Sequence, residues 1–418
     1  LYQSALETAT LLKASLGRPI VIGGPHATMF PARLPTDPPV LHHVVRGEGE
    51  LTLRELVEAL EGQRDLSSVA GLTYRVRSEV VSNLDRELLA DLDSLPFPAR
   101  QHFDLSRYGL RTPQGQPMVT ILSSRGCPYN CSYCFKGIVG RTYRHRSPQN
   151  IIAEIKQVIG QTGIRSLYFI DDLFTADVKR LSELMELMIA EKLDIRWQCL
   201  ARVDRVTPEV LRTMYAAGCR RIHLGIESGN PDVLKQISKG IKLDQVRQTV
   251  RWAKDAGIQV KGYFMLGLPG DTEETLEQTI EFASSLPLTE AMFSIATPFP
   301  GTRLWDELVR RHPETQYNAD FTKTYYYNSY TAEIAPFMNV SDVPDERLSG
   351  LAIEARRRFD EAKRRRMYER SFGKTLGPAL WEVSRIKPLR QLGNALLGAG
   401  MLGSFRQVRE RAGANSWA

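Results

Sequence analysis

The sequence predicts an α/β chain whose middle part is a parallel barrel or a part of one. Apolar stretches of strand length alternate with helical patterns six times between residues 118 and 305, and such alternation gives parallel sheets covered by helices. Three helix starts carry a capping residue followed by proline, because the cap accepts an orphan N–H and proline has none to lose: Ser147-Pro148, Thr207-Pro208 and Asn230-Pro231. In such a barrel we expect the functional residues at the C-terminal ends of the strands.

The composition limits the classes of protein to which the chain can belong. Its 418 residues are 42% hydrophobic and 25% charged, which favours two or three globular domains and excludes a wholly disordered chain, a collagen or a disulfide-rich miniprotein. No apolar run reaches the roughly 18 residues that span a bilayer, since glycines interrupt the nearest candidate at 392–405. The sequence starts at Leu1 without a signal peptide, which predicts a cytoplasmic protein truncated at its N-terminus.

Positive charge is concentrated near the C-terminus. The formal net charge is +7, and twelve basic against four acidic side chains lie between residues 355 and 390. The Arg and Lys runs at 356–366 are typical of a solvated helix face, and the alternative is a peripheral contact with a membrane surface. Four apolar side chains are available for that contact: Trp381, Leu389, Leu392 and Leu396. We expect no nucleic-acid partner, because aromatic residues are sparse among the charges.

The N-terminal segment, 1–90, contains two strand–helix units. Strands are predicted at 19–22 and 43–45 and helices at 5–16 and 51–60, which implies a parallel sheet too small to be complete. Each strand ends in a turn with glycines, Gly23-Gly24-Pro25-His26 and Gly47-Glu48-Gly49-Glu50. Glycine lets a ligand approach the backbone closely, and open α/β sheets bind ligands beyond the carboxyl ends of their strands.

Three further segments complete the predicted order of the chain. A proline-rich linker occupies 91–117, the barrel occupies 118–305, and a helical basic extension with a long helix at 348–368 occupies 306–418. In the barrel, Asp271 and Glu274 have the spacing of a capping box at the start of a helix. The six predicted barrel strands are 118–123, 166–171, 196–201, 221–226, 259–266 and 291–296.

Three of the five cysteines lie within eight residues, in the loop that follows the first barrel strand. Cys127, Cys131 and Cys134 have C-x3-C-x2-C spacing, which suits three irons of a cubane cluster whose fourth iron stays open for a small molecule. The alternatives are a structural zinc site with His145 as fourth ligand, or three buried free cysteines. An odd cysteine number without a secretory signal indicates a reducing compartment rather than a disulfide framework. The other two cysteines, Cys199 and Cys219, are expected as small buried apolar residues.

This loop resembles the signature of the radical S-adenosylmethionine (SAM) superfamily, which has an aromatic residue such as Tyr133 before the last cysteine. The resemblance extends over 118–305, through Phe169-Ile170-Asp171-Asp172, Gly225-Ile226-Glu227-Ser228 and Gly267-Leu268-Pro269-Gly270. It implies a partial (βα)6 barrel, a [4Fe–4S] cluster on the three cysteines, and SAM as cofactor. The SAM contacts that it implies are Tyr133, Asp171, Asp172, Arg202, Glu227, Ser228, Gly267, Leu268 and Pro269. For Arg202 the alternative is a surface salt bridge, and for Glu227 a structural role.

The N-terminal segment resembles the second half of a Rossmann-like cobalamin-binding domain, which precedes the barrel in one class of radical SAM enzymes. The resemblance implies cobalamin in the full-length protein, near six residues of the glycine turns: Gly23, Gly24, Pro25, His26, Gly47 and Glu48. The first strands of that domain and its D-x-H-x-x-G signature are absent from the sequence. His26 is therefore expected as a loop histidine, with ligation of cobalt as the alternative.

The function implied by these resemblances is cobalamin-dependent methyl transfer to an unactivated carbon of a small-molecule or lipid-like substrate. One SAM would methylate cobalamin, and reductive cleavage of a second would give the 5′-deoxyadenosyl radical that activates the substrate. The alternatives are a non-methylating radical reaction, as in the magnesium-protoporphyrin ester cyclase-like members, and a non-catalytic iron–sulfur protein. A flavodoxin or ferredoxin is expected as electron donor. No catalytic residue is assigned beyond the cofactor ligands, and His223 is a candidate contact inside the barrel.

Overall fold

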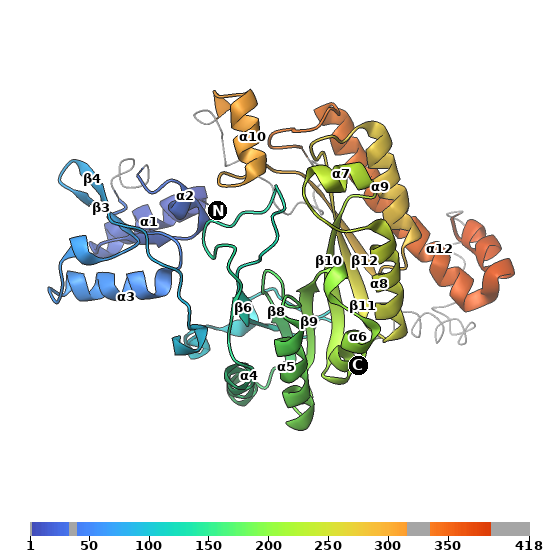
Figure 1. Ribbon diagram of the computed structural model, residues 1–418, viewed down its shortest axis with the longest axis horizontal. Helices are drawn as coiled ribbons and strands as arrows, with labels where there is room; N and C mark the ends of the chain where they lie inside the picture. Colours follow the sequence, from blue (N-terminus) through green and yellow to red (C-terminus); the bar gives the residue numbers. More distant parts are fainter. Residues whose placement is uncertain (1, 33–39, 316–334, 386–418) are drawn as a thin grey trace. The chain divides into compact units, whose positions relative to one another are not determined.

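The computed structural model describes residues 2–32, 40–315 and 335–385 and divides the chain into two compact units (Figure 1). Unit 1 takes Leu1–Pro96, Ser124–Arg146 and Thr297–Tyr326, and unit 2 takes Phe97–Ser123, Ser147–Ala296 and Tyr327–Ala418. The chain therefore passes between the units several times.

Unit 1 contains a four-stranded sheet of order β1-β2-β3-β4, formed by Val21–Gly23, His43–Val45, Leu72–Val76 and Glu79–Ser82. The first two strands are parallel, as the sequence predicts, whereas β2–β3 and β3–β4 are antiparallel. The parallel pairing of the two predicted strands is therefore confirmed, and the sheet also contains an antiparallel hairpin that the sequence did not predict. The β3–β4 hairpin turns at Arg77, with φ 55°, and lacks the Asn-Gly or Asp-Gly signal that identifies such turns in a sequence.

Helices cover both faces of the sheet in unit 1: α1 (Tyr2–Leu16), α2 (Pro25–Met29) and α3 (Gly49–Leu60). Neighbouring residues of a strand point to opposite faces, so Val44 and Val45 of β2 belong to different apolar clusters. Val44 packs with Ala9 of α1 and Ala27 of α2. Val45 packs with Leu56 of α3. The layered arrangement is that of a small Rossmann-like domain.

Two short elements of unit 1 flank the predicted cysteine loop, and one helix follows the barrel sequence. They are β6 (Ser124–Arg125), β7 (Arg144–His145) and α10 (Arg303–Arg311). The β6 and β7 strands pair antiparallel and close the chain between them into a loop.

Unit 2 contains a six-stranded sheet in which every neighbouring pair is parallel, in the order β12-β11-β10-β9-β8-β5. Each strand pairs with the next strand of this sheet in sequence order, and the first and last remain edges, which makes the sheet a partial barrel. The strands are β5 (Val119–Ile121), β8 (Ser166–Phe169), β9 (Arg196–Ala201), β10 (Cys219–Glu227), β11 (Gln259–Leu266) and β12 (Glu290–Ile295). All six predicted strands are confirmed, and two have the predicted bounds.

Helices connect these strands and lie along one side of the sheet (Figure 1). They are α4 (Pro148–Thr162), α5 (Val178–Ala190), α6 (Pro208–Ala216), α7 (Pro231–Gln236), α8 (Leu243–Asp255) and α9 (Glu273–Ser285). In β11, residues alternate between buried and half-buried positions, so Phe264 packs under the helices while Lys261 and Tyr263 occupy the inner face.

The predicted helix caps are confirmed at three starts. Ser147 Oγ accepts from the Asn150 N–H at 3.2 Å, Thr207 and Asn230 act in the same way, and proline follows each cap. The predicted capping box at Asp271 is wrong, because α9 is capped by Thr272 and its partner Thr275.

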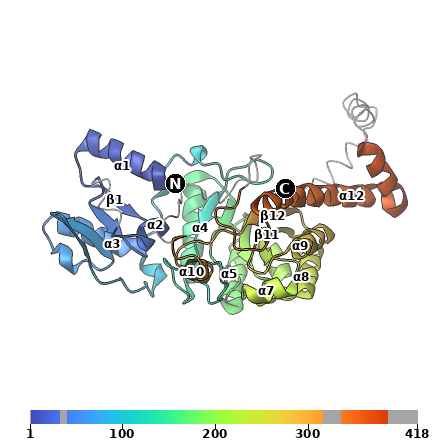
Figure 2. The ribbon, with the colours of Figure 1, turned by 90° about the horizontal axis from the view of Figure 1, so that it is seen from above.

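A long helix, α12 (Asp345–Arg385), follows in unit 2 and is interrupted by a non-helical residue at Gly373. It packs on α9 and β12 and then extends past the helices that cover the sheet (Figure 2). The predicted helix at 348–368 is confirmed, and Leu389, Leu392 and Leu396 lie outside the described residues. Among the helices that the structure describes, none has the length and apolar character needed to cross a membrane.

Candidate active site

The cysteine loop of unit 1 runs from Gly126 to Tyr143, between β6 and β7. Cys127, Cys131 and Cys134 are free and partly exposed, and the Cys134 N–H donates to the Cys131 carbonyl at 3.2 Å. Gly126 has φ 82°, and a Cβ atom there would overlap the carbonyl oxygen of Thr142. The entry to the loop therefore needs glycine both for its backbone angle and for the close approach of the returning chain.

The donor set of this loop fits an iron–sulfur cluster. Burial raises the pKa of the Cys134 thiol, Lys136 lowers it, and the charges of Cys131 and Cys127 raise it further, so the three sulfurs lie within electrostatic reach. In the described part of the chain, no three His, Cys, Asp or Glu side chains converge on one metal ion. Cubane ligands need not converge, because each thiolate holds a different iron.

The two glycine turns of unit 1 meet at the C-terminal ends of β1 and β2. Gly23 lies beside Val45 in the parallel register, and the Gly47 N–H donates to Thr28 Oγ1 at 3.0 Å. The same Thr28 hydroxyl donates to the Gly24 carbonyl at 2.9 Å. The structure thus brings together both turns that the sequence singled out, through a threonine of α2 that it did not. His26 lies in α2, with its ring 5.1 Å from that of Phe30.

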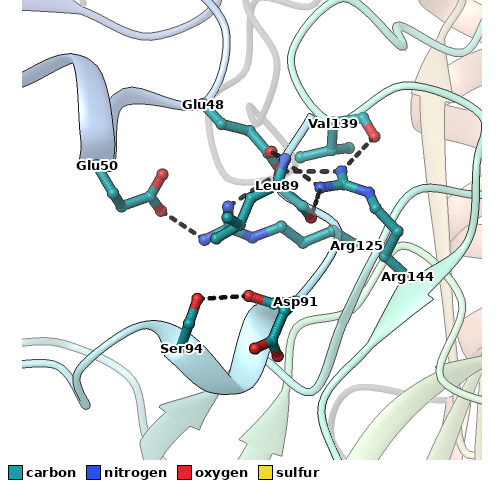
Figure 3. Close-up of polar contacts among 8 residues, drawn as sticks. All are labelled: Glu48, Glu50, Leu89, Asp91, Ser94, Arg125, Val139 and Arg144. Carbon is teal, nitrogen blue, oxygen red and sulfur yellow. Dashed lines mark hydrogen bonds and ion pairs between the residues drawn. The ribbon is translucent and has the colours of Figure 1, made fainter. Parts of the chain in front are cut away.

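Glu48 is buried in the second turn and binds two arginines (Figure 3). Its Oε1 accepts from Arg125 Nη1 at 3.0 Å and from Arg144 Nη2 at 2.9 Å. Its Oε2 accepts from Arg144 Nη1 and from the Leu89 N–H, both at 2.9 Å. Burial alone would raise the pKa of this carboxyl, but the bonds from Arg144, Leu89 and Arg125 lower it below its ordinary value. Glu48 is therefore a charged, buried carboxylate.

In unit 2, the buried Asp171 ties the end of β8 to the end of β5. Its carboxylate accepts from the Ser123 N–H at 3.2 Å and from Ser123 Oγ at 2.7 Å. Arg180 of α5 donates to the Ser123 carbonyl at 2.9 Å. Asp172, the next residue, is exposed. Three side-chain bonds thus fix Ser123, the last residue before the unit 1 segment Ser124–Arg146.

A buried ionic cluster lies at the ends of β9 and β10. Glu227 accepts from Lys239 Nζ at 2.8 Å, and Arg202 donates to the Lys239 and Gly240 carbonyls and to Asp204. Glu227 has φ 69°, a strained angle for a residue with a side chain, and the strand register shifts beside it. Such strain at a strand end, together with buried charge, is typical of functional positions.

The turn Gly267-Leu268-Pro269-Gly270, with three of the predicted SAM contacts, follows β11. Gly267 has φ 78°, Leu268 is buried, and the Leu268 N–H donates to Asp271 Oδ2 at 2.8 Å. Burial raises the pKa of Asp271 to about 6, against the lowering effect of bonds from Thr275, Leu268 and Gly267. Ser228, which is also a predicted SAM contact, shares a hydrogen bond of 3.1 Å with Thr279 of α9.

Inside the partial barrel, His223 is surrounded by polar side chains. Its Nε2 lies 3.3 Å from Gln198 Oε1, and its Nδ1 lies 3.3 Å from Tyr168 Oη and 3.2 Å from Tyr263 Oη. Because Gln198 Oε1 only accepts, the geometry fits a proton on Nε2 and an accepting Nδ1. Burial, then Lys261 and Arg221, lowers the pKa of His223 to about 3, so the ring is neutral at physiological pH.

Comparison with known proteins identifies the family. A family model described as the radical SAM superfamily matches residues 121–283. A protein of Pyrococcus horikoshii named as an uncharacterized methyltransferase is 35% identical over 337 residues, which are 80% of this chain and 71% of the relative. The chain belongs to the radical SAM superfamily.

Two further proteins resemble it over shorter parts of their length. The anaerobic magnesium-protoporphyrin IX monomethyl ester cyclase of Cereibacter sphaeroides is 31% identical over 295 residues, which are 69% of this chain and 48% of the cyclase. The chain thus spans about half of that relative. The radical SAM methyltransferase TsrM of Kitasatospora setae, solved with cobalamin and a [4Fe–4S] cluster, has a TM-score of 0.61 and 22% identity, over 73% of this chain and 60% of TsrM. This likeness shows the fold and confirms the predicted architecture.

Membership in the radical SAM superfamily implies SAM and a [4Fe–4S] cluster as cofactors. The residues predicted to serve them fall in both units: the cysteines and Tyr133 in unit 1, and the remaining SAM residues in unit 2. The glycine turns predicted for cobalamin lie in unit 1. Sequence reasoning missed Thr28, Lys239 and the partners of His223, namely Tyr168, Gln198 and Tyr263. Tyr168, Gln198 and Tyr263 all lie in predicted strands. The alternation of side chains along a strand, which indicates the face of the sheet that each occupies, was the one signal that could have identified them.

Proposed function

We propose that this radical SAM enzyme transfers a methyl group, with cobalamin, to an unactivated carbon of a small-molecule or lipid-like substrate. The observation that carries the proposal is the meeting of the two glycine turns through Thr28, at the strand ends where open α/β sheets bind their ligands. The methyltransferase name of the Pyrococcus relative and the cobalamin bound to TsrM support it.

The residues of this chain would have two roles, which are to hold the cofactors and to exclude water. Cys127, Cys131 and Cys134 would hold the cluster, and Arg202 and Glu227 would meet the polar groups of SAM. When bound, the cluster and SAM would supply the one-electron cleavage that yields a 5′-deoxyadenosyl radical. Asp171 keeps Ser123, the end of the predicted first barrel strand, fixed to the end of β8. The apolar packing of the sheet against its helices gives a wall from which water is excluded.

The test is a product analysis of the protein after anaerobic reconstitution with iron, sulfide and hydroxocobalamin. SAM carrying a labelled methyl group and a reductant are added without substrate, and mass spectrometry quantifies S-adenosylhomocysteine, 5′-deoxyadenosine and label on the corrinoid. We expect S-adenosylhomocysteine together with labelled corrinoid. Formation of 5′-deoxyadenosine alone would contradict methyl transfer, and absence of all three products would favour a non-catalytic iron–sulfur protein.

A second candidate function is a non-methylating radical reaction such as oxidative cyclisation of a tetrapyrrole. The 31% identity to the Cereibacter cyclase favours it. It predicts 5′-deoxyadenosine without label on the corrinoid, and hydrogen loss from a tetrapyrrole added to the assay.

The proposed partners are a flavodoxin or ferredoxin as electron donor and, in the cytoplasm, a membrane surface beside the basic part of α12. The described contacts of α12 use some of its basic residues within unit 2: Arg347 binds Glu273, Arg358 binds Glu277, and Arg366 donates to the Ser284 carbonyl. Arg357 and Arg365 pair with Glu361 and Glu369 on the helix itself. Vesicles with anionic lipids should sediment the protein if the remaining basic residues bind a membrane.

A further inference from the structure

Both ends of the cysteine loop are held by one carboxylate. Arg125 lies in β6, two residues before Cys127, and Arg144 lies in β7, where the chain leaves the loop. Glu48 accepts hydrogen bonds from both guanidinium groups and lies in the turn that follows β2 (Figure 3). All three residues belong to unit 1.

We propose that Glu48 is a positioning residue for the iron–sulfur cluster, because it fixes the two strands from which the cysteine loop departs. The inference goes beyond the proposed methyl transfer and rests only on the cluster that the cysteine loop would hold. It gives the Glu48 side chain a role in the geometry of the loop. This role is separate from any ligand contact made by the backbone of Gly47 and Glu48.

The geometry distinguishes this carboxylate from an ordinary surface ion pair. The Glu48 and Arg144 side chains are 5% and 8% exposed, and the Arg144 guanidinium meets both carboxylate oxygens. Charge-assisted bidentate bonds hold their partners in a defined orientation, whereas exposed pairs contribute little. Arg144 also donates to the Val139 carbonyl at 2.9 Å, inside the loop, and to the Leu89 carbonyl at 2.7 Å. Through Arg144, Glu48 therefore holds the loop at its stem and at Val139.

The two strands of the stem could not maintain this arrangement alone. Each has two residues, and their pairing comprises only Ser124 with His145 and Arg125 with Arg144. An isolated hairpin, even a long one, is at best marginally stable in water. Removing the Glu48 charge would leave the buried Arg144 without its carboxylate partner and beside Arg125, which keeps Glu50, and this favours separation of the stem. The cysteines would keep their thiol groups but lose the fixed spacing on which cluster assembly depends.

The experiment compares Glu48→Gln, Glu48→Asp and Glu50→Gln in the full chain. Glu50 is the matched control, because it binds the same Arg125 but its side chain is 43% exposed and does not reach Arg144. After anaerobic reconstitution, iron and sulfide are counted, and the reduced cluster is examined by electron paramagnetic resonance with and without SAM. Thermal unfolding of the apoprotein reports folding separately.

We expect Glu48→Gln to lower the iron content at least twofold, or to abolish the change of spectrum on SAM addition, while its circular dichroism spectrum stays native. Glu48→Asp should lose less of the iron content and of the response to SAM than Glu48→Gln, and Glu50→Gln should behave as wild type. A Glu48→Gln protein with wild-type iron content and a wild-type response to SAM would overturn the proposal. If Glu48→Gln does not fold, Arg144→Lys replaces it and is judged by the same readouts, since lysine keeps the charge but loses the bidentate bonds. No readout involves cobalamin or a methyl acceptor, so failure of the proposed function leaves this test valid.

Discussion

Single thiolates determine whether the cysteine loop can hold a cluster. Cys131→Ala removes one of three ligands, and we expect it to abolish cluster assembly and SAM cleavage, because the iron that it binds would lack a protein ligand. Iron analysis and quantification of 5′-deoxyadenosine measure the effect. The control is Cys219→Ala, which truncates a buried cysteine outside the loop and should keep the iron. A Cys131→Ala protein with full iron content and an unchanged cleavage rate would exclude this ligand.

His223 makes the stability of unit 2 dependent on pH. Its pKa is about 3 in the folded protein, below the ordinary 6.5, so its contribution is fully present above pH 6.5 and is lost as the pH falls toward 3. Each unit of pKa difference corresponds to about 1.4 kcal/mol, so this group should cost the wild type about 2 kcal/mol of unfolding free energy at pH 5 relative to pH 7. Urea unfolding at both pH values should show a smaller loss for His223→Gln. Equal losses in the two proteins would refute the assignment.

At the scale of an element, the stem of the cysteine loop depends on Gly126. Gly126→Ala combines a left-handed backbone angle with a clash against the Thr142 carbonyl. The angle alone costs roughly 1–2 kcal/mol, and the clash with backbone adds to it. We expect a lower unfolding temperature and reduced iron content. Gly115→Ala is the matched control, since its φ is the same 82° but a Cβ atom would meet nothing within 4 Å. Equal effects of both substitutions would show that only the angle matters.

Elements with strong local signals could be predicted from the sequence, and elements without them could not. The strands Arg196–Ala201 and Gln259–Leu266 have the predicted bounds, since apolar residues and flanking turns define them. The β3–β4 hairpin was missed because Arg77 takes a positive φ that no glycine announces. Lys239 was missed because its partner Glu227 lies twelve residues away, across a turn and a helix. The residues of the cysteine motif could be identified, but the bonds of Glu48 to its stem arise only in three dimensions.

At the scale of the whole molecule, the chain interleaves its two units. It passes between them at 96–97, 123–124, 146–147 and 296–297. The cysteine loop and the end of the predicted first barrel strand are close in sequence, but they belong to different units. The division into units does not affect the assignment of the chain to its family, since the family's sequence motifs are local.

The long helix α12 is an integral part of unit 2. Phe359 is 2% exposed, and its ring lies 6.5 Å from that of Phe293 in β12. Leu348, at the other end of the packed part, is fully buried and lies beside Gly267, a predicted SAM contact. A basic helix that did not pack on unit 2 would leave these apolar side chains exposed to water. Because they are buried, the packed half of α12 stabilises the barrel.

This packing predicts a difference between two neighbouring residues of α12. Phe359→Ala should lower the free energy of unfolding by about 3–5 kcal/mol, since it removes a buried aromatic ring and leaves a cavity. Arg357→Ala, two residues earlier, truncates a side chain that is 58% exposed and should change the stability by no more than about 0.5 kcal/mol. Denaturant unfolding of both variants, followed by tryptophan fluorescence, measures the difference. If Phe359→Ala unfolded like the wild type, α12 would be separable from the barrel, and its basic residues would be free to serve a partner without disturbing unit 2.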